Sequence, residues 1–185
     1  MIVAIRANLI KVTVNLKLKY MNWAYFHLFL NHFPIIGVLI GTCLILAGMF
    51  YKNQGAMLSG LATNVFAALT AILAYLTGDP AEKAVKGFPD VAQSLMSRHE
   101  NIATVAMYVL IPAGLLAAVT FYSILKKDRS VRFLVIITLV MSIISSVGMV
   151  YTGRTGGQIR HSEFRDAATK NYVIEHQNDT IDEDD

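Results

Sequence analysis

Cysteine is nearly absent from this chain: Cys43 is its only one in 185 residues. A lone cysteine excludes an internal disulfide and any zinc or iron–sulfur cage built from several thiolates. Covalent haem attachment is excluded as well, because the chain has no C-x-x-C-H motif. Cys43 falls inside an apolar run, where we expect it to be a small buried hydrophobic residue.

Charge is also scarce. Charged residues make up 16% of the sequence, and mean hydropathy is +0.49. The charge-free runs are Phe33–Phe50, Met57–Leu76, Ile102–Leu125 and Phe133–Tyr151. Each reaches or nearly reaches the roughly 20 residues that a helix needs to cross a hydrocarbon core. Because only a helix hides its own backbone polar groups in lipid, the sequence predicts an all-α integral membrane protein with a four-transmembrane-helix bundle.

The lack of charge inside these runs also argues against an ion or proton transporter, which usually carries ionisable groups at mid-membrane. Asn64 is the only amide within them. The net charge of +3 is modest, and the basic residues flank the apolar runs. We therefore expect lipid contacts and no nucleic-acid partner.

The chain divides into three parts. Residues 1–20 alternate polar and apolar residues, a pattern that suits a strand and not a helix. We expect Met21 to be the true start and residues 1–20 to be a wrongly assigned N-terminal extension; the alternative is a basic arm on the membrane surface. Residues 21–165 form the four-helix transmembrane domain. Residues 166–185 lose apolar periodicity and end in acidic residues, which predicts a disordered acidic tail.

Proline and glycine mark the ends of the predicted helices. Pro34 removes a helical hydrogen bond, so the first span either starts near Asn31 or kinks there. Thr77-Gly78 ends the second span. Asp79 can then cap a short helix, and the amphipathic 78–100 connection is predicted to form a lid over one end of the bundle. Pro112 is expected to bend the third span.

The two halves of the chain resemble each other weakly. In the first half, His32 precedes two apolar runs that end at Thr77-Gly78. In the second half, His99 precedes two runs that end at Thr152-Gly153. Two such helical hairpins can pack about an axis along the membrane normal. This equivalence predicts that His32 and His99 face each other.

Four histidines lie at the ends of the apolar runs, and alternating spans place all four at one membrane surface. They are His27, His32, His99 and His161. A b-type haem needs an apolar slot between helices, one or two axial imidazoles, and cations for its propionates. The spacing predicts His32 and His99 as axial ligands to the haem iron, with His27 and His161 orienting that pair or holding a second haem.

Other residues complete the predicted haem site. Arg98 and Arg160 adjoin histidines, where their guanidinium groups would pair with propionates. Close approach of the backbone to the cofactor is predicted at four further positions: Thr77, Gly78, Gly156 and Gly157.

Two other interpretations fit the same residues. The four histidines, with Glu100, Asp79 or Glu163, would suit a copper or zinc ion, although no H-x-x-x-H pair fixes two ligands on one helix face. The second alternative is a cofactor-free structural or assembly subunit of a membrane complex, in which the histidines and arginines are ordinary residues of the membrane interface.

Several motifs carry a resemblance to a known group of proteins. They are Asn31-His-Phe-Pro-Ile35, Thr77-Gly-Asp-Pro-Ala-Glu82, Arg98-His-Glu100 and Thr155-Gly-Gly-Gln-Ile-Arg-His161. Together they resemble a group of uncharacterised bacterial four-helix membrane proteins over residues 21–165. A distantly similar family of small membrane proteins is proposed to bind haem b. The resemblance implies a redox protein of the membrane and supplies no substrate.

The function expected from these features is electron transfer. A non-covalent haem b would pass electrons between the quinone pool and a redox protein at the membrane surface, alone or within a larger complex, so that the chain is more an electron-transfer protein than a stand-alone enzyme. Basic residues are densest in the two short loops, which favours placing those loops in the cytoplasm. We therefore expect a bacterial inner-membrane protein whose termini and histidine site are extracytoplasmic; counting the basic residues of 1–20 would reverse that orientation.

Overall fold

The computed structural model describes residues 23–86, 88, 91–127 and 131–179. These ranges contain helices and no strand. The elements are α2 (His32–Phe50), α3 (Gln54–Leu76), α4 (Gly78–Val85), α5 (Gln93–Leu125), α6 (Val131–Arg160), the 3₁₀ turn η1 (Ser162–Phe164) and α7 (Ala167–Asp179). Residues 23–30 are also helical and precede α2. The predicted extension, residues 1–20, lies outside the described residues.

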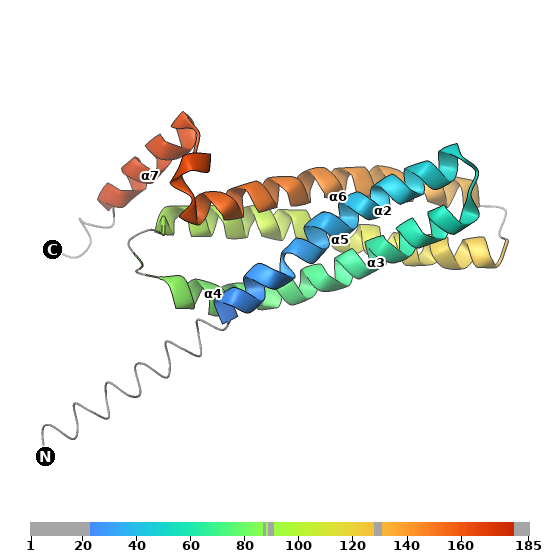
Figure 1. The fold of residues 1–185 in the computed structure, drawn as a ribbon, viewed down its shortest axis with the longest axis horizontal. Coiled ribbons are helices and arrows are strands. Elements are labelled where there is room, and N and C mark those ends of the chain that lie inside the picture. Colours follow the sequence, from blue (N-terminus) through green and yellow to red (C-terminus); the bar gives the residue numbers. More distant parts are fainter. Residues whose placement is uncertain (1–22, 87, 89–90, 128–130, 180–185) are drawn as a thin grey trace, which may run out of the picture.

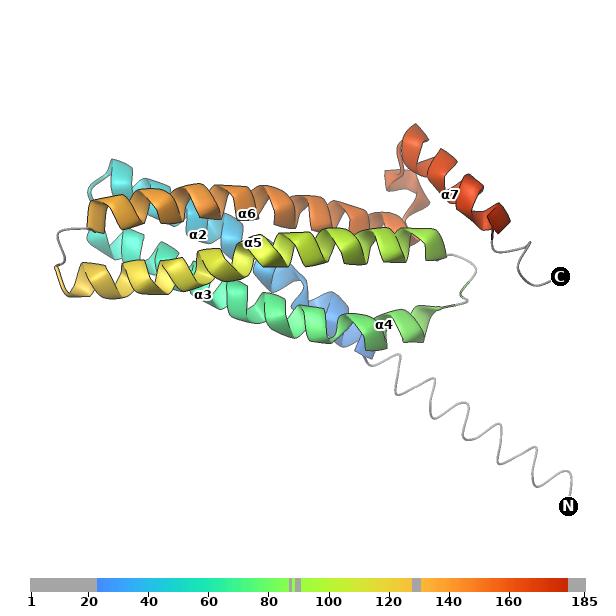
Figure 2. The same cartoon turned by 180° about the vertical axis from the view of Figure 1, so that it is seen from behind.

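Four helices among the described residues are long and apolar enough to cross a membrane, by length and composition, which confirms that part of the prediction. They are Trp23–Phe50, Gln54–Leu76, Gln93–Leu125 and Val131–Arg160. In the bundle, α2 packs against α3, α3 against α5, α5 against α6, and α6 back against α2. Figures 1 and 2 show an elongated bundle with α4 and α7 at the same end. That end also holds the start of α5 and the close of α6.

Small residues bring α2 and α3 into close contact. A Cβ added at Gly37 would lie 3.1 Å from the Cβ of Ala67, and one at Gly41 would overlap the side-chain oxygen of Asn64. A Cβ at Gly60 would lie 2.7 Å from the carbonyl oxygen of Gly41. Gly37 and Gly41 therefore lie in the α2–α3 contact, where only glycine lets the two backbones approach.

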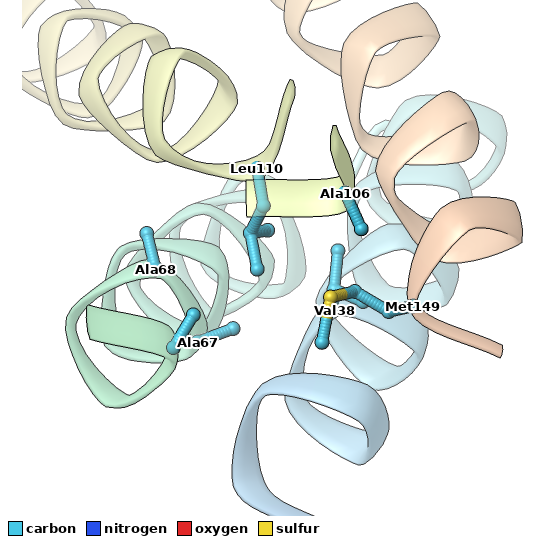
Figure 3. Close-up of a cluster of buried hydrophobic side chains, with 7 residues drawn as sticks. Val38, Ala67, Ala68, Ala106, Leu110 and Met149 are labelled. Atoms are coloured by element: carbon cyan, nitrogen blue, oxygen red, sulfur yellow. The ribbon is translucent and has the colours of Figure 1, made fainter. Parts of the chain in front are cut away.

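The bundle interior combines small apolar residues with polar ones, several of which are hydrogen-bonded between helices. One cluster of buried apolar residues, drawn in Figure 3, joins all four long helices: Val38, Ala67, Ala68, Ala71, Ala106, Leu110 and Met149. Toward the loop end, the amide of Asn64 donates to Ser142 Oγ at 2.6 Å, and the hydroxyls of Thr120 and Thr138 lie 2.7 Å apart. Such interhelical hydrogen bonds satisfy polar groups that would be costly if left unpaired in an apolar interior.

The ends of α2 and α5 share an unusual backbone feature. Lys52 and Lys127, each two residues beyond the last residue of its helix, have φ values of 53° and 56°. This left-handed conformation ends a helix and reverses the chain. After α2 the turn is completed by a bond from the Asn53 amide to the Gly48 carbonyl at 2.9 Å, and the Asn53 side chain caps α3.

Two expectations need correction. Cys43 is exposed on the outside of the bundle, because it follows Thr42, whose hydroxyl faces inward to Ser146. The short helix α4 begins at Gly78, with Thr77 and not Asp79 at its N-cap position. Pro112 lies within α5, which continues from Gln93 to Leu125, and the bend expected there stays a prediction.

The predicted disorder of residues 166–185 is wrong for most of that segment, because residues 167–179 form α7. The helix is fixed by tertiary contact: Val173 is buried against Ala92 and Leu95 at the start of α5. Asp166 Oδ1 also accepts a hydrogen bond from the Thr169 amide at 2.8 Å, a typical N-terminal cap. Residues 180–185 lie outside the described residues.

The first span interrupts its helical hydrogen bonding where Pro34 requires it. Residues 23–30 are helical, Asn31 is a turn, and α2 begins at His32. The Asn31 amide still bonds to the carbonyl of His27 at 3.0 Å. Proline at the third position of α2 has no N–H to give to the preceding turn, so the break falls at the predicted place.

Candidate functional site

His27 lies in the helical turn before α2 and reaches across to the end of α3. Its Nδ1 is 2.9 Å from the carbonyl oxygen of Ala74 and 3.0 Å from Thr77 Oγ1. The Thr77 hydroxyl donates its own hydrogen to the Ala74 carbonyl at 2.8 Å. The ring is half-buried, and Gly78 follows directly: a Cβ there would lie 3.9 Å from His27 Cε1.

His99 occupies the matching place in the second half. It lies in the second turn of α5, half-buried, with Nδ1 3.1 Å from Thr155 Oγ1 on α6. The Thr155 hydroxyl donates its hydrogen to the Thr152 carbonyl at 2.9 Å. A Cβ at Gly156 would lie 3.0 Å from His99 Cε1, so the ring rests on the glycine.

These hydrogen bonds fix the protonation pattern of both rings. A threonine hydroxyl has one hydrogen, and in both cases that hydrogen goes to a carbonyl. The hydroxyl oxygen and the carbonyl can then only accept, so Nδ1 of His27 and of His99 must carry the proton. Nε2 of each neutral ring is left with a free lone pair, and no described residue donates to it. This is the arrangement in which histidine binds a metal through Nε2 while Nδ1–H is held by an acceptor.

The two rings form one candidate site. Both lie at the end of the bundle where α3 and α6 finish, and they are near enough to interact electrostatically. A Thr-Gly pair positions each ring. Thr77-Gly78 holds His27 from 50 residues further along the chain, and Thr155-Gly156 holds His99 from 56 residues further along. The half-repeat therefore matches His27 with His99 and Thr77 with Thr155. The predicted alignment matched His32 with His99 and Thr77-Gly78 with Thr152-Gly153. In the structure His27 takes the place of His32 in the first half, and Thr155-Gly156 takes the place of Thr152-Gly153 in the second.

His32 does not face His99, contrary to the expectation. Its side chain is exposed, and its Nδ1 is 2.6 Å from the carbonyl oxygen of Leu28 on its own helix. The reason is helical geometry: His27 and His32 are five residues apart, about 500° of rotation, so they cannot share a face of the helix. Pro34 is itself buried, so the face of α2 that carries Pro34 points into the bundle, and the face that carries His32 does not.

His161 lies outside the helix end and is also exposed. Its Nδ1 lies 2.9 Å from Glu163 Oε1, and its ring contacts Phe164 with centroids 5.4 Å apart. A hydrogen bond from the backbone of Glu163 itself, followed by the His161 side chain, lowers the pKa of the Glu163 carboxyl. The structure therefore pairs His161 with a local carboxylate and does not bring it to the other histidines.

The remaining predicted site residues lie in different surroundings, and only some of them are near a histidine ring. The Arg98 guanidinium lies 5.6 Å from the centre of the Tyr172 ring, beneath α7. Arg160 is exposed at the last position of α6. A Cβ at Gly157 would have open space around it, unlike one at Gly156. Only Gly156 of the two glycines thus supports a histidine ring. Thr155, which the sequence analysis did not single out, could have been found by matching the two Thr-Gly dipeptides.

A copper or zinc site with four histidine ligands finds no support. The part of the chain that the structure describes has no group of three or more His, Cys, Asp or Glu side chains that could hold a metal ion. All of the residues proposed for that site lie in the described ranges. Two imidazoles at matching positions suit a cofactor that brings its remaining ligands with it, as a haem does with its four ring nitrogens.

No protein-family model, curated protein or solved structure matches the chain. The function must therefore be argued from the site itself.

Proposed function

We propose that the chain is an integral membrane protein of two helical hairpins, each of which contributes one axial histidine to a single b-type haem. The first hairpin is α2–α3, with the turn that carries His27, and the second is α5–α6, with His99. Their lipid-facing residues are large and apolar, among them Phe66 and Val105, which are 50% and 65% exposed. Such exposure is ordinary for a protein whose solvent is the hydrocarbon of a bilayer.

The observation that carries the haem proposal is the matched tautomer of His27 and His99. Each half-buried ring presents an Nε2 lone pair to which no described residue donates, and a Thr-Gly pair positions each ring. Two axial imidazoles would leave no open coordination position, which favours electron transfer over oxygen or substrate chemistry at the iron. When bound, the haem would supply one-electron transfer by cycling its iron between the ferric and ferrous states.

The surrounding residues have separable roles in this proposal. Thr77 and Thr155 hold the imidazole rings in orientation and raise their basicity through the Nδ1–H bond. Gly78 and Gly156 leave room for the rings beside the backbone. Arg98, next to His99 in sequence, remains the candidate partner for a propionate; its guanidinium lies against the Tyr172 ring of α7.

Absorption spectroscopy of the variants tests the proposal. The purified full chain should show a sharp alpha band on reduction, typical of low-spin haem with two histidine ligands. His27→Ala and His99→Ala should each lose haem or convert it to a high-spin form. His32→Ala and His161→Ala are matched controls, since both side chains are exposed and bond only locally.

The outcomes separate the competing functions. A featureless spectrum from haem-replete cells would favour the cofactor-free subunit. Loss of the low-spin spectrum in His32→Ala, with His27→Ala unaffected, would restore the pairing first predicted from sequence and reject the present one.

A further inference from the structure

The two ends of the bundle differ in charge. The end that holds the α2–α3 and α5–α6 turns, here called the loop end, lies opposite α4 and α7 (Figures 1 and 2). Every acidic residue of the described ranges lies at the histidine end: in α4, at Glu100 beside His99, or from η1 onward. Basic residues are mixed with them there. The loop end has no acid among its described residues and has four basic ones: Lys52, Lys126, Lys127 and Arg132.

The basic side chains of the loop end have no anionic partner in the described part of the chain. The ion pairs found there, Arg154–Asp166 and His161–Glu163, are both at the histidine end. Lys126 lies instead against an aromatic ring, with its Nζ 5.5 Å from the centre of Tyr122. Asp128 and Arg129 lie outside the described residues, and their opposite formal charges cancel. The excess of positive charge at the loop end is therefore not neutralised by the chain itself.

Lysine occupies a position in both turns where glycine is the usual residue. Lys52 and Lys127 have φ values of 53° and 56°, a conformation that glycine adopts without steric cost because it has no Cβ. A lysine at these positions accepts that cost and adds a cation beyond the carboxyl end of a helix, where the helix dipole favours positive charge. Its occurrence in both turns indicates that the charge matters there, since the backbone alone would favour glycine.

Exposed aromatic rings adjoin these cations. Phe50 and Tyr51 precede Lys52 and are 78% and 74% exposed, and Phe133 follows Arg132 and is 67% exposed. Aromatic rings at the ends of membrane-spanning helices lie where the hydrocarbon meets the lipid headgroups. A lysine beside them reaches into the headgroup layer, in which the lipid phosphates are the available anions. An acidic soluble protein would meet the cations and leave the rings uncovered.

We propose that the loop end binds the headgroups of anionic phospholipids such as phosphatidylglycerol. Lys52 would hold a lipid phosphate at one turn, and Lys126, Lys127 and Arg132 would hold one at the other. This inference rests on the membrane part of the proposed function and not on the haem. Each lysine near an anionic headgroup strengthens association by up to about fivefold, so the cations together favour anionic over zwitterionic lipid.

Proteoliposomes of phosphatidylcholine that contain the full chain and a trace of spin-labelled lipid test the inference. Electron paramagnetic resonance gives the association constant of labelled phosphatidylglycerol relative to labelled phosphatidylcholine. The wild type should prefer the anionic lipid by at least about threefold, and Lys52→Gln/Lys126→Gln/Lys127→Gln should lose most of that preference.

A matched control removes the same number of charges from the other end. Lys83→Gln/Lys86→Gln/Lys170→Gln replaces three lysines that are also exposed, and it should keep the wild-type preference. Equal melting temperatures in a neutral detergent would show that both variants fold. Wild-type preference in the loop-end variant, or an equal loss in both variants, would overturn the inference.

An excess of glycerol 3-phosphate at constant ionic strength separates a lipid from a small anion. It should leave the preference unchanged; displacement of the labelled lipid would indicate a small-anion site and overturn the inference.

Further outcomes separate this inference from the proposed function. His27→Ala/His99→Ala should keep the lipid preference, whether or not the wild type holds haem. A chain that floats with the vesicles but does not prefer phosphatidylglycerol would refute the lipid inference and leave the membrane proposal intact. A chain that does not float with them would refute both.

Discussion

The imidazole Nδ1 of His99 lies 3.1 Å from the hydroxyl oxygen of Thr155, on a different helix and 56 residues along the chain. His27 makes the same contact with Thr77 in the other half, at 3.0 Å. Lys52 and Lys127, with their left-handed backbones, lie midway within each half. The two halves therefore share a histidine, a reversal at lysine and a Thr-Gly exit. The spacings from histidine to lysine and from lysine to threonine are 25 residues each in the first half and 28 residues each in the second.

Replacing Thr155 should tune the histidine without removing it. In Thr155→Val the Nδ1–H bond to the hydroxyl is lost, so the ring becomes a weaker electron donor. The midpoint potential of the bound haem should rise by some tens of millivolts, while haem content stays close to wild type. Thr155→Ser, which keeps the hydroxyl, is the control in a redox titration. An unchanged potential in Thr155→Val would mean that this hydroxyl does not act on the cofactor.

Gly156 and Gly157 should respond differently to the same substitution. The new Cβ of Gly156→Ala would meet His99 Cε1 at 3.0 Å and push the ring aside, whereas Gly157→Ala has open space. We expect Gly156→Ala to lower haem occupancy severalfold and Gly157→Ala to leave it unchanged. Haem per protein, measured by the pyridine haemochrome method, gives the comparison. Equal occupancy in the two variants would show that Gly156 is not a support for His99.

The α2–α3 contact should not tolerate a side chain at Gly41. Gly41→Ala would overlap the Asn64 amide oxygen and should destabilise the bundle by about 1–3 kcal/mol. The new Cβ would also lie 2.9 Å from the Gly60 carbonyl oxygen, so Asn64→Ala should relieve only the part of the clash that its side chain causes in the double variant. Thermal unfolding in detergent measures the coupling between the two sites. If the two substitutions had strictly additive effects on stability, the cost of Gly41→Ala would not come from a clash with Asn64.

Lower pH should loosen the C-terminal helix. Hydrogen bonds from the side chain and backbone of Thr169, and then the charge of Arg154, hold the pKa of Asp166 below its usual 3.8. A lowered folded-state pKa contributes stability above the unfolded value and loses it as the pH falls through the folded one. The N-terminus of α7 should therefore exchange its amide hydrogens faster, relative to the intrinsic rate, below pH 3.8. Asp166→Asn, which cannot titrate, should remove the pH dependence; if it persists, another group is responsible.

The orientation of the protein is open to a direct test. If the short loops are cytoplasmic, a cysteine at Gln54 should resist an impermeant thiol reagent in intact cells, while one at Ser162 should react. Both need a Cys43→Ser background, because Cys43 is exposed on the outside of the bundle. The reverse labelling pattern would place the histidine site and the proposed redox partner in the cytoplasm.

The number and approximate position of the apolar helices could be predicted from the sequence because each is a local property, although α5 begins nine residues before its charge-free run and α6 ends nine residues after its own. Charge-free runs of sufficient length define them, and Pro34 and Thr77-Gly78 mark breaks that the structure places at Asn31 and at the end of α3. That histidines gather at one end also follows from alternating direction along the chain. None of these conclusions depends on how one helix is rotated against another.

The sequence alone did not determine how each helix is rotated about its own axis. Which face of α2 turns inward is decided by the glycine contacts with α3, and these bury Gly37 and Gly41 while leaving His32 and Cys43 outside. The same packing brings His27, and not His32, to Thr77. The helix at 167–179 likewise depends on Val173 finding Leu95, a contact between segments nearly 80 residues apart. Length and hydropathy therefore fixed the helices, whereas side-chain packing across them selected the histidines that share a site.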